Sequence, residues 1–303
     1  MKLGFIGLGK MGSQMVEQLV QAGHEVVATD HNQEAIDQAA QNGALAAASR
    51  DELVQKLGES PVVWLMIPSK FVDDEIDALL KILPKDSIIV DGGNSDFRDT
   101  RKRNERCKQA SVKLVDVGTS GGVLGIKQGF SMMAGSDSEA AFQTVEPAVK
   151  VMAAREGYQY FGPSGAGHYV KMIHNGIEYG IMEAYAEGYL LLKEGKDYPG
   201  LDLAGLAKVW QHGSIIASEL NGLTQQILEK NPELEGASGY VAESGEGRWT
   251  LETGKEQGIK MPAIQAALDD RLASEHGEVN FGTKLLAEMR NAFGGHPLNK
   301  KEW

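Results

Sequence analysis

The sequence predicts an α/β fold, with a doubly wound sheet over residues 1–162 and an all-helical domain over residues 163–303. In the first half, short apolar runs alternate with helical stretches, as a parallel sheet with crossover helices requires. Beyond that half the alternation stops and the remaining pattern is helical. A chain of 303 residues also fits two domains of roughly 100–200 residues each.

Apolar runs of strand length and amphipathic stretches give the individual elements. The predicted strands are Leu3–Ile6, Glu25–Thr29, Val62–Met66, Ile88–Val90, Lys113–Val117, Phe130–Ala134 and a weaker Tyr158–Phe161. The predicted helices between them are Met11–Ala22, Gln33–Asn42, Val72–Leu83, Thr100–Ala110 and Ser138–Met152. One long helix is expected from Gly165 to Lys193, with Ser164 as its N-cap, because this stretch lacks proline and keeps a helical apolar period.

Composition excludes several classes of partner. Lys and Arg number 30 against 42 Asp and Glu, so the net charge of −12 repels nucleic acid and anionic membrane surfaces. An anionic substrate therefore needs a local cationic pocket. The single cysteine, Cys107, has no partner for an intrachain disulfide, and neither a signal peptide nor an apolar stretch of about 18 residues is present. We expect a soluble cytoplasmic protein.

A dinucleotide site is predicted near the N-terminus. The motif Gly7-Leu8-Gly9-Lys10-Met11-Gly12 follows the first predicted strand and opens a helix, whose N-terminal amides suit a pyrophosphate. Asp30 ends the next strand at about the distance expected for an acid that binds the ribose hydroxyls. We expect Met66, Ile67, Pro68 and Asn94 to line the same site. The alternative is a glycine-rich turn with a surface aspartate.

The same aspartate predicts NAD rather than NADP as the cofactor. Its carboxylate would repel a 2′-phosphate, and the following residues, His31 and Asn32, include no arginine to neutralise one. A protonated His31 would soften this preference.

The long predicted helix carries a chemical face. Taking about 100° per residue, five side chains fall within an arc of roughly 140°. They are Lys171, His174, Asn175, Glu178 and Tyr179. The opposite side, which we expect to be buried, carries Val170, Met172, Ile173, Ile177 and Ile181. The alternative is a solvated amphipathic face, but Lys171 and Glu178 are two turns apart, wider than a surface pair and wide enough for a small substrate.

Other polar segments are expected around the same substrate. Asp91–Ser95 and Thr119–Gly122 follow predicted strands, where doubly wound sheets bind ligands, although both are also typical of tight turns. Arg248, Arg271 and Arg290 are the cationic candidates for an anionic group, and each alone is more often a surface arginine.

At these residues the sequence resembles the 6-phosphogluconate dehydrogenase family, within the wider β-hydroxyacid dehydrogenases. The resemblance covers nearly the whole chain and runs through GLGKMG, DGGNSDFRDT, DVGTSGG, GAGHYVKMIHNGIEYG, GRWT and RNAFGGH. It implies a Rossmann-type domain, a helical substrate and dimerisation domain, and oxidation of 6-phosphogluconate to ribulose 5-phosphate and CO2 in the pentose phosphate pathway. The chain looks like the short bacterial form, which lacks a second helical repeat.

The resemblance also implies a role for each matching residue. Lys171 is the general base and later acid, and Glu178 protonates the enediol. The sugar acid is held by Asn94, Ser120, Gly121, Gly122, His174 and Asn175. The phosphate is held by Tyr179, Arg248, Thr250, Arg271 and Arg290, and His296 completes the site. Because the terminal Arg and His reach across from a neighbouring subunit in the family, a homodimer or a dimer-based tetramer is implied.

Two departures from the long form bear on these roles. Arg248 stands where the long form usually has Lys, which keeps the positive charge and permits a forked contact with phosphate. Asp30 stands where NADP-using members have a neutral residue before an Arg, which changes the expected cofactor.

The implied mechanism needs a neutral Lys171, so we expect burial and neighbouring cations to depress its pKa. No metal is expected, since the histidines form neither an HExxH motif nor a Cys/His cluster. The rivals are a dehydrogenase for a small unphosphorylated β-hydroxy acid and a catalytically silent NAD-binding protein. Convergence of Arg248, Arg271 and Arg290 would favour a phosphorylated substrate, whereas scattering would favour the first rival.

Overall fold

The computed structural model describes residues 1–122, 125–295 and 298. Two compact units make up the chain, Met1–Met172 and Ile173–Trp303. The predicted boundary after residue 162 precedes the first turns of the long helix, and these turns pack on the sheet of the first unit.

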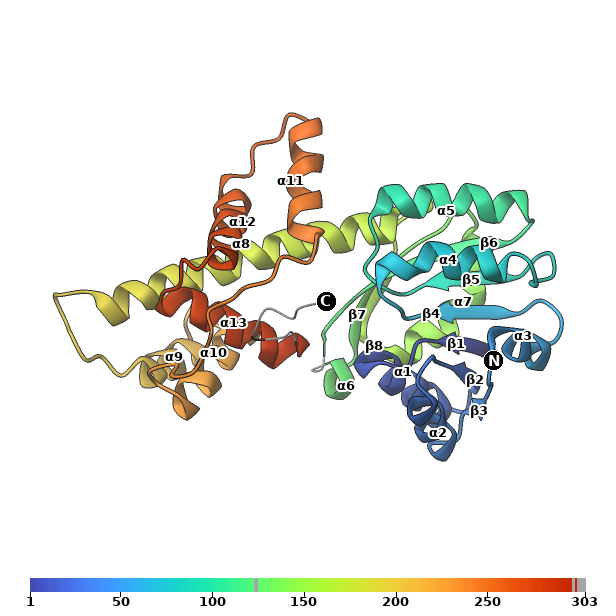
Figure 1. Ribbon diagram of the computed structural model, residues 1–303, viewed down its shortest axis with the longest axis horizontal. Helices are drawn as coiled ribbons and strands as arrows, with labels where there is room; N and C mark the ends of the chain where they lie inside the picture. The colour runs from blue at the N-terminus through green and yellow to red at the C-terminus, as the bar shows by residue number, and fades with distance from the viewer. Residues whose placement is uncertain (123–124, 296–297, 299–303) are drawn as a thin grey trace. The chain divides into compact units, whose positions relative to one another are not determined.

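The first unit is built on one sheet of eight strands in the order β3-β2-β1-β4-β5-β6-β7-β8 (Figure 1). The strands are β1 (Lys2–Ile6), β2 (Glu25–Thr29), β3 (Leu45–Ala46), β4 (Val62–Leu65), β5 (Ile88–Asp91), β6 (Lys113–Ser120), β7 (Phe130–Gly135) and β8 (Ala153–Tyr160). Strands β1 to β6 pair in parallel, and the order reverses direction between β1 and β4. Such a switch point is where doubly wound sheets bind ligands.

Strand β7 departs from the parallel arrangement that the alternation predicted, because it pairs antiparallel with β6. A parallel neighbour needs a crossover of about a dozen residues or more. Only residues 121–129 connect β6 to β7, so the chain turns back instead. The next connection contains a full helix, and β8 is parallel to β7.

Helices cover both faces of this sheet (Figure 1). They are α1 (Lys10–Gln21), α2 (Gln33–Gln41), α3 (Arg50–Leu57), α4 (Ser69–Leu79), α5 (Phe97–Gln109), α6 (Gly125–Gln128) and α7 (Glu139–Met152). One core joins α1, α2 and α7 to strand residues such as Phe5 and Trp64, and another joins α3, α4 and α5 to the alternate residues Ile6 and Leu65. Alternate residues of a strand point to opposite faces of the sheet. Because helices cover both faces, the buried strands are apolar almost throughout.

Three elements of the first unit were absent from the sequence prediction, the short strand β3 and the helices α3 and α6. A strand of two residues is too short to show a period. Helix α3 carries a detectable start signal, because Ser49 accepts a hydrogen bond from the Glu52 amide while the Glu52 carboxylate accepts one from the Ala48 amide. A serine followed three residues later by glutamate is the sequence signature of such a start.

The second unit is entirely helical over its described residues, as predicted (Figure 1). The helices of this half are α8 (Ala166–Glu194), α9 (Leu203–Gln211), α10 (Glu219–Lys230), α11 (Glu246–Glu256), α12 (Pro262–Glu275) and α13 (Phe281–Gly294). Helix α8 begins and ends within a residue of the predicted Gly165–Lys193 helix and continues from the first unit into the second. Within the residues described, no helix has the length and apolar character needed to cross a membrane.

The expected burial of α8 is partly wrong. The predicted apolar side includes Ile177 and Ile181, whose exposed fractions are 54% and 45%, whereas Tyr179 of the predicted polar side is only 4% exposed. Tyr179 is buried because Gly247 of α11 and Arg271 of α12 pack against its ring. Tyr179, on the polar side of α8, therefore faces the interior of the second unit, and part of the apolar side lies on the surface.

Candidate active site

The glycine motif forms a tight turn at the switch point of the sheet. Gly7 follows β1 with a φ of 101°, and a side chain there would overlap the carbonyl of Met66 after β4. A side chain at Gly12 in α1 would in turn overlap the carbonyl of Gly7. Both glycines are required by close backbone packing, and they bring the segment after β1 against Met66 and Ile67.

The middle glycine of the motif is different, because it faces open space. Among the described residues, no atom outside the local chain lies within 4 Å of a Cβ built on Gly9, and no side chain caps the start of α1. The N-terminus of a helix carries unpaired amides and a positive partial charge, which bind phosphate groups. The motif therefore fits the pyrophosphate of a dinucleotide, which would approach along Gly9 towards Lys10 and Met11.

Asp30 is held beside this motif at the end of β2. Its Oδ2 accepts a hydrogen bond of 2.6 Å from the Leu8 amide, and its Oδ1 accepts one of 2.9 Å from the Asn32 amide. Nδ1 of the exposed His31 lies 2.9 Å from the same Oδ1. The carboxylate is thus fixed at the position where Rossmann-type domains bind the ribose.

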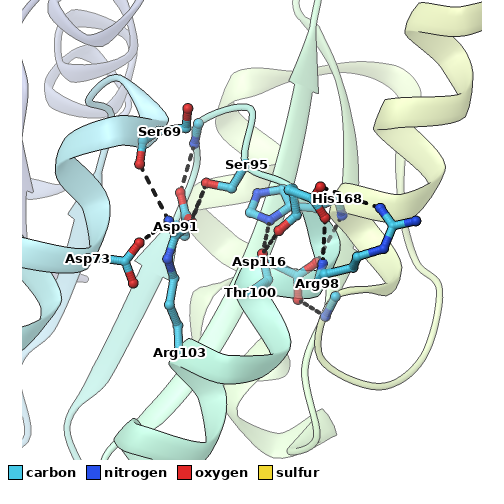
Figure 2. Close-up of polar contacts among 12 residues, drawn as sticks. Ser69, Asp73, Asp91, Ser95, Arg98, Thr100, Arg103, Asp116 and His168 are labelled. Carbon is cyan, nitrogen blue, oxygen red and sulfur yellow. Dashed lines mark hydrogen bonds and ion pairs between the residues drawn. The ribbon is translucent and has the colours of Figure 1, made fainter. Parts of the chain in front are cut away.

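A buried ion network anchors the loop after β5, as Figure 2 shows. Arg103 of α5 donates to Asp91 at 3.2 Å, to Ser95 at 2.8 Å and to Asp73 of α4 at 2.7 Å. Asp91 and Ser95 bracket Asn94, which is exposed while its neighbours Gly93 and Ser95 are buried. The network holds the ends of the loop and leaves the Asn94 amide at the surface. Arg103 was not among the predicted functional residues, because the charged side chains of a basic helix usually face solvent.

Strand β6 packs against the first turns of α8. A side chain at Gly118 would overlap Cβ of Lys171 and lie 2.9 Å from its Cγ, so the aliphatic part of Lys171 rests directly on β6. Lys171 is only 4% exposed. Two residues beyond Gly118, Ser120 ends the strand, and Gly121 and Gly122 follow with positive φ. The structure therefore brings Lys171 close to the Ser-Gly-Gly turn within one unit.

Further along α8, in the second unit, three predicted residues form a local group. Nδ1 of His174 lies 3.0 Å from Oδ1 of Asn175 and 3.8 Å from Oε2 of Glu178. Asn175 is buried, whereas the other two are partly exposed. The three side chains thus lie side by side on adjacent turns of the helix.

A buried cationic cluster lies beside Tyr179 in the same unit. The Arg271 guanidinium stacks 3.3 Å from the centre of the Tyr179 ring, and Arg271 is 1% exposed. Burial, with a contribution from neighbouring Arg290, lowers the pKa of Arg271 to about 10. Burial also lowers the pKa of Arg290. Nε and Nη1 of Arg271 have no hydrogen-bond partner among the described residues, so two charged donors are available in a buried place.

The other residues that were predicted to bind the phosphate differ in their burial and contacts. Thr250 is buried against α8, where a side chain at Gly176 would lie 2.7 Å from its Cγ2. The Arg248 side chain is 50% exposed and donates to Glu243 at 2.8 Å. Arg271 and Arg290 therefore lie near one another, whereas Arg248 pairs with a carboxylate, so the expected convergence of three arginines is found for two of them. His296 lies outside the described residues.

Arg290 is the terminal arginine that, according to the resemblance, a neighbouring subunit contributes to the site. In the structure, Arg290 lies on α13 of the same chain, near its own Tyr179 and Arg271. The cationic pair of the second unit thus forms within a single chain.

Comparisons with known proteins match both halves of the chain. Residues 2–162 match the model for the NAD binding domain of 6-phosphogluconate dehydrogenase, and residues 167–292 match that for the 6-phosphogluconate dehydrogenase C-terminal domain. The NAD(+)-dependent, decarboxylating 6-phosphogluconate dehydrogenase of Haloferax volcanii is 40% identical over 305 residues, covering 100% of both chains. A putative 6-phosphogluconate dehydrogenase of Bacillus subtilis, YqeC, is 39% identical over 302 residues, or 99% of this chain and 100% of its own.

Solved structures agree. The 6-phosphogluconate dehydrogenase of Plasmodium falciparum superimposes with a TM-score of 0.83 at 30% identity, over 92% of this chain and 63% of that one. The 3-hydroxyisobutyrate dehydrogenase of Mycobacterium tuberculosis shares the fold, with a TM-score of 0.73 at 22% identity over 94% and 97% of the two chains. The chain thus consists of an NAD(P)-binding Rossmann-type domain followed by a helical domain, and each matches its family model in that order. This chain is a member of the 6-phosphogluconate dehydrogenase family.

Proposed function

We propose that this protein catalyses the oxidative decarboxylation of 6-phosphogluconate to ribulose 5-phosphate and CO2, with NAD as the hydride acceptor. The observation that carries the proposal is the buried Arg271, which lies beside Arg290 and has two donors without partners among the described residues. Burying an uncompensated charge is costly, so such a residue is expected to meet an anion from outside the chain. A phosphate oxygen can accept from such a charged donor, and the negative charge of the phosphate offsets that of the buried guanidinium groups.

This cluster separates the proposal from its nearest rival. A small unphosphorylated hydroxy acid would need a single cation for its carboxylate and would leave the second arginine without an anionic group of the substrate to bind. Tyr179 and Thr250, both buried in the same unit, would add hydroxyl groups to the phosphate site. A catalytically silent NAD-binding protein would have no use for such a site.

We propose Lys171 as the proton acceptor for the 3-hydroxyl group. Bound NAD supplies the acceptor for the hydride that leaves C3. Neutral Lys171 takes the hydroxyl proton, which leaves a ketone β to the carboxylate, so that CO2 is lost readily. The protonated Lys171 then donates to the C3 oxygen as the enediol forms. Its burial on Gly118 suits this role, since desolvation favours the neutral amine.

We propose that Glu178 delivers the final proton to C1 of the enediol. Nδ1 of His174 lies 3.8 Å from the Glu178 carboxyl group, so a protonated imidazole would act on that group through its positive charge. We also propose that His174 and Asn175 bind the sugar acid. The resemblance implies the same role for Asn94, Ser120, Gly121 and Gly122.

Turnover tests the proposal directly. The purified protein, given 6-phosphogluconate and NAD, should form NADH and CO2 in equal amounts, whereas 3-hydroxyisobutyrate and unphosphorylated gluconate should react far more slowly. Reaction only with an unphosphorylated acid, without CO2, would identify the rival dehydrogenase. The absence of turnover with every acid would leave the silent NAD-binding protein.

We propose NAD rather than NADP as the physiological cofactor, on the fixed carboxylate of Asp30. Asp30→Asn should raise KM for NAD by about tenfold, because a hydrogen bond to a charged group contributes about 1.5–3 kcal/mol. Loss of the negative charge should also improve the use of NADP, so that the ratio of kcat/KM for NADP over NAD rises at least about tenfold. Initial rates with both cofactors measure this ratio.

Asp37→Asn is the matched control, since Asp37 lies on α2 and accepts a hydrogen bond only from nearby Gln33 among the described contacts. It should leave the ratio unchanged. An Asp30→Asn ratio equal to that of the control would refute the proposed basis of cofactor choice.

We propose that the protein forms a homodimer through α8. Ile177 and Ile181 are exposed one helical turn apart, where a second copy could cover them. Replacing both with glutamate should convert the dimer to a monomer, because charges within an apolar interface are strongly unfavourable. Sedimentation velocity measures the change, and Ile259→Glu, at an equally exposed position, serves as the control. A monomeric wild type, or a double variant that remains dimeric, would contradict the assignment.

We also propose a cytoplasmic location, on the state of the single cysteine. Cys107 is a buried free thiol, and burial raises its pKa to about 12. Such a thiol is inert and fits a reducing compartment, where disulfides are rare.

A further inference from the structure

The first turn of α8 is capped by a residue from another element. Oδ1 of Asp116, on β6, accepts a hydrogen bond of 2.7 Å from the Gly165 amide, and its Oδ2 accepts one of 2.9 Å from the His168 amide (Figure 2). The predicted N-cap, Ser164, does not have this role, since its Oγ is buried without a partner among the described residues. The correction has a physical reason. A carboxylate offers two acceptor oxygens and a full charge at the positive end of the helix, which a hydroxyl group cannot match.

The capped turn has little freedom to shift. A side chain at Gly167 would overlap the carbonyl of Met133 on β7, and one at Gly135 would lie 2.9 Å from Oδ1 of Asp116. Asp116 itself is fully buried, and this burial raises its pKa. The start of α8 therefore lies directly on the backbone of β6 and β7, and the carboxyl group of Asp116 lies between the helix and these strands.

A second contact ties the same turn to α5. Nδ1 of the buried His168 lies 2.7 Å from Oγ1 of Thr100, and that hydroxyl group donates to the carbonyl of Asp96 at 3.1 Å (Figure 2). A hydroxyl group has only one hydrogen to donate. Because Thr100 donates that hydrogen to the Asp96 carbonyl, Nδ1 of the imidazole must donate to the Thr100 oxygen. The turn is thus held from β6 by Asp116 and from α5 by Thr100.

Lys171 follows this turn directly. It lies three residues after His168, on the same side of the helix, and rests on Gly118, which is two residues from Asp116 in β6. Residues two apart in a strand point to the same face, so Asp116 and Gly118 act on α8 from one surface. Displacement of the first turn would move Lys171 by a comparable amount.

We propose that Asp116, assisted by the Thr100–His168 contact, is a positioning residue that fixes the reactive amine of Lys171. The inference rests on the proposed function, in which Lys171 is the general base. Positioning acts on the chemical step, since small displacements of a catalytic group reduce its rate strongly. Substrate and cofactor binding depend on other residues, so kcat should fall while KM values stay nearly constant.

Asp116→Asn tests the proposal with a change of almost no volume. One oxygen of the carboxylate becomes an NH2 group that faces a backbone amide, so at least one cap hydrogen bond is lost. We expect kcat with 6-phosphogluconate to fall at least about tenfold, with both KM values within about threefold of wild type. Hydrogen exchange of the amides of residues 165–168, followed by mass spectrometry, should become at least about tenfold faster.

Asp137→Asn is the matched control. Asp137 accepts a hydrogen bond of 2.9 Å from the Ser164 amide, one residue before the capped turn, and pairs with Lys108. It should leave both kcat and the exchange of residues 165–168 unchanged. If Asp116→Asn does not fold, Thr100→Val removes the second contact and should show the same division between kcat and KM.

The outcomes are distinct. Faster exchange in Asp116→Asn with kcat within twofold of wild type would overturn positioning while leaving the proposed function intact, and so would a rise in KM at constant kcat. Unchanged exchange would overturn the cap itself. No turnover by the wild-type protein would overturn the proposed function and this inference together.

Discussion

Lys171→Met is expected to lower kcat with 6-phosphogluconate by about 10³- to 10⁴-fold, the upper range for removing a group that acts as both base and acid. Methionine retains an unbranched side chain of similar length, so the packing on Gly118 is largely preserved. Only the amine is lost. NADH formation under saturating substrate measures kcat, and cofactor titration by fluorescence shows that the dinucleotide site is intact.

Lys150→Met provides the comparison. Lys150 lies on α7, is largely exposed and pairs with Glu146, so its loss should change kcat less than twofold. A Lys171→Met protein that keeps more than about a tenth of the wild-type kcat would show that another group removes the proton.

Arg271→Met is expected to separate activity from stability. Losing a charge-assisted hydrogen bond to the phosphate, at about 1.5–3 kcal/mol, should lower kcat/KM for 6-phosphogluconate by about 10- to 10²-fold. The unfolding temperature should stay the same or rise, because the variant removes a buried charge whose Nε and Nη1 have no partner among the described residues. Lost stacking on Tyr179 would offset part of this gain.

Paired assays and thermal scans decide this point. Arg50→Met removes a partly exposed arginine paired with Glu75 in the first unit and should change kcat/KM little. A large loss of stability in Arg271→Met, with substrate affinity retained, would mean that Arg271 serves the fold rather than a phosphate.

The sequence predicted best where chemistry and periodicity coincide. The Gly7–Gly12 motif, the strands before and after it and the long helix were each confirmed, because a tight turn, buried apolar runs and a proline-free period leave strong local signals. The resemblance was confirmed by the family matches over both halves. The roles of individual site residues remain predictions.

What the sequence did not predict depends on contacts between distant segments. Asp116 and His168 are 52 positions apart, and nothing local marks that aspartate as the cap of α8. The same holds for Arg103, whose partners Asp73 and Asp91 lie on two other elements. The burial of α8 was misjudged for a related reason, since a helical period separates two faces without showing which one the neighbouring helices cover.

The course of α8 limits how this enzyme can be taken apart. The first compact unit ends at Met172, just after Lys171, whereas Glu178 belongs to the second. A chimaera that takes its helical half from a related dehydrogenase and is joined at that boundary would combine the donor's residue at position 178 with Lys171 of this chain. Grafts intended to alter substrate choice should therefore retain residues 165–179 as one segment, together with the strand surface around Gly118 on which it rests.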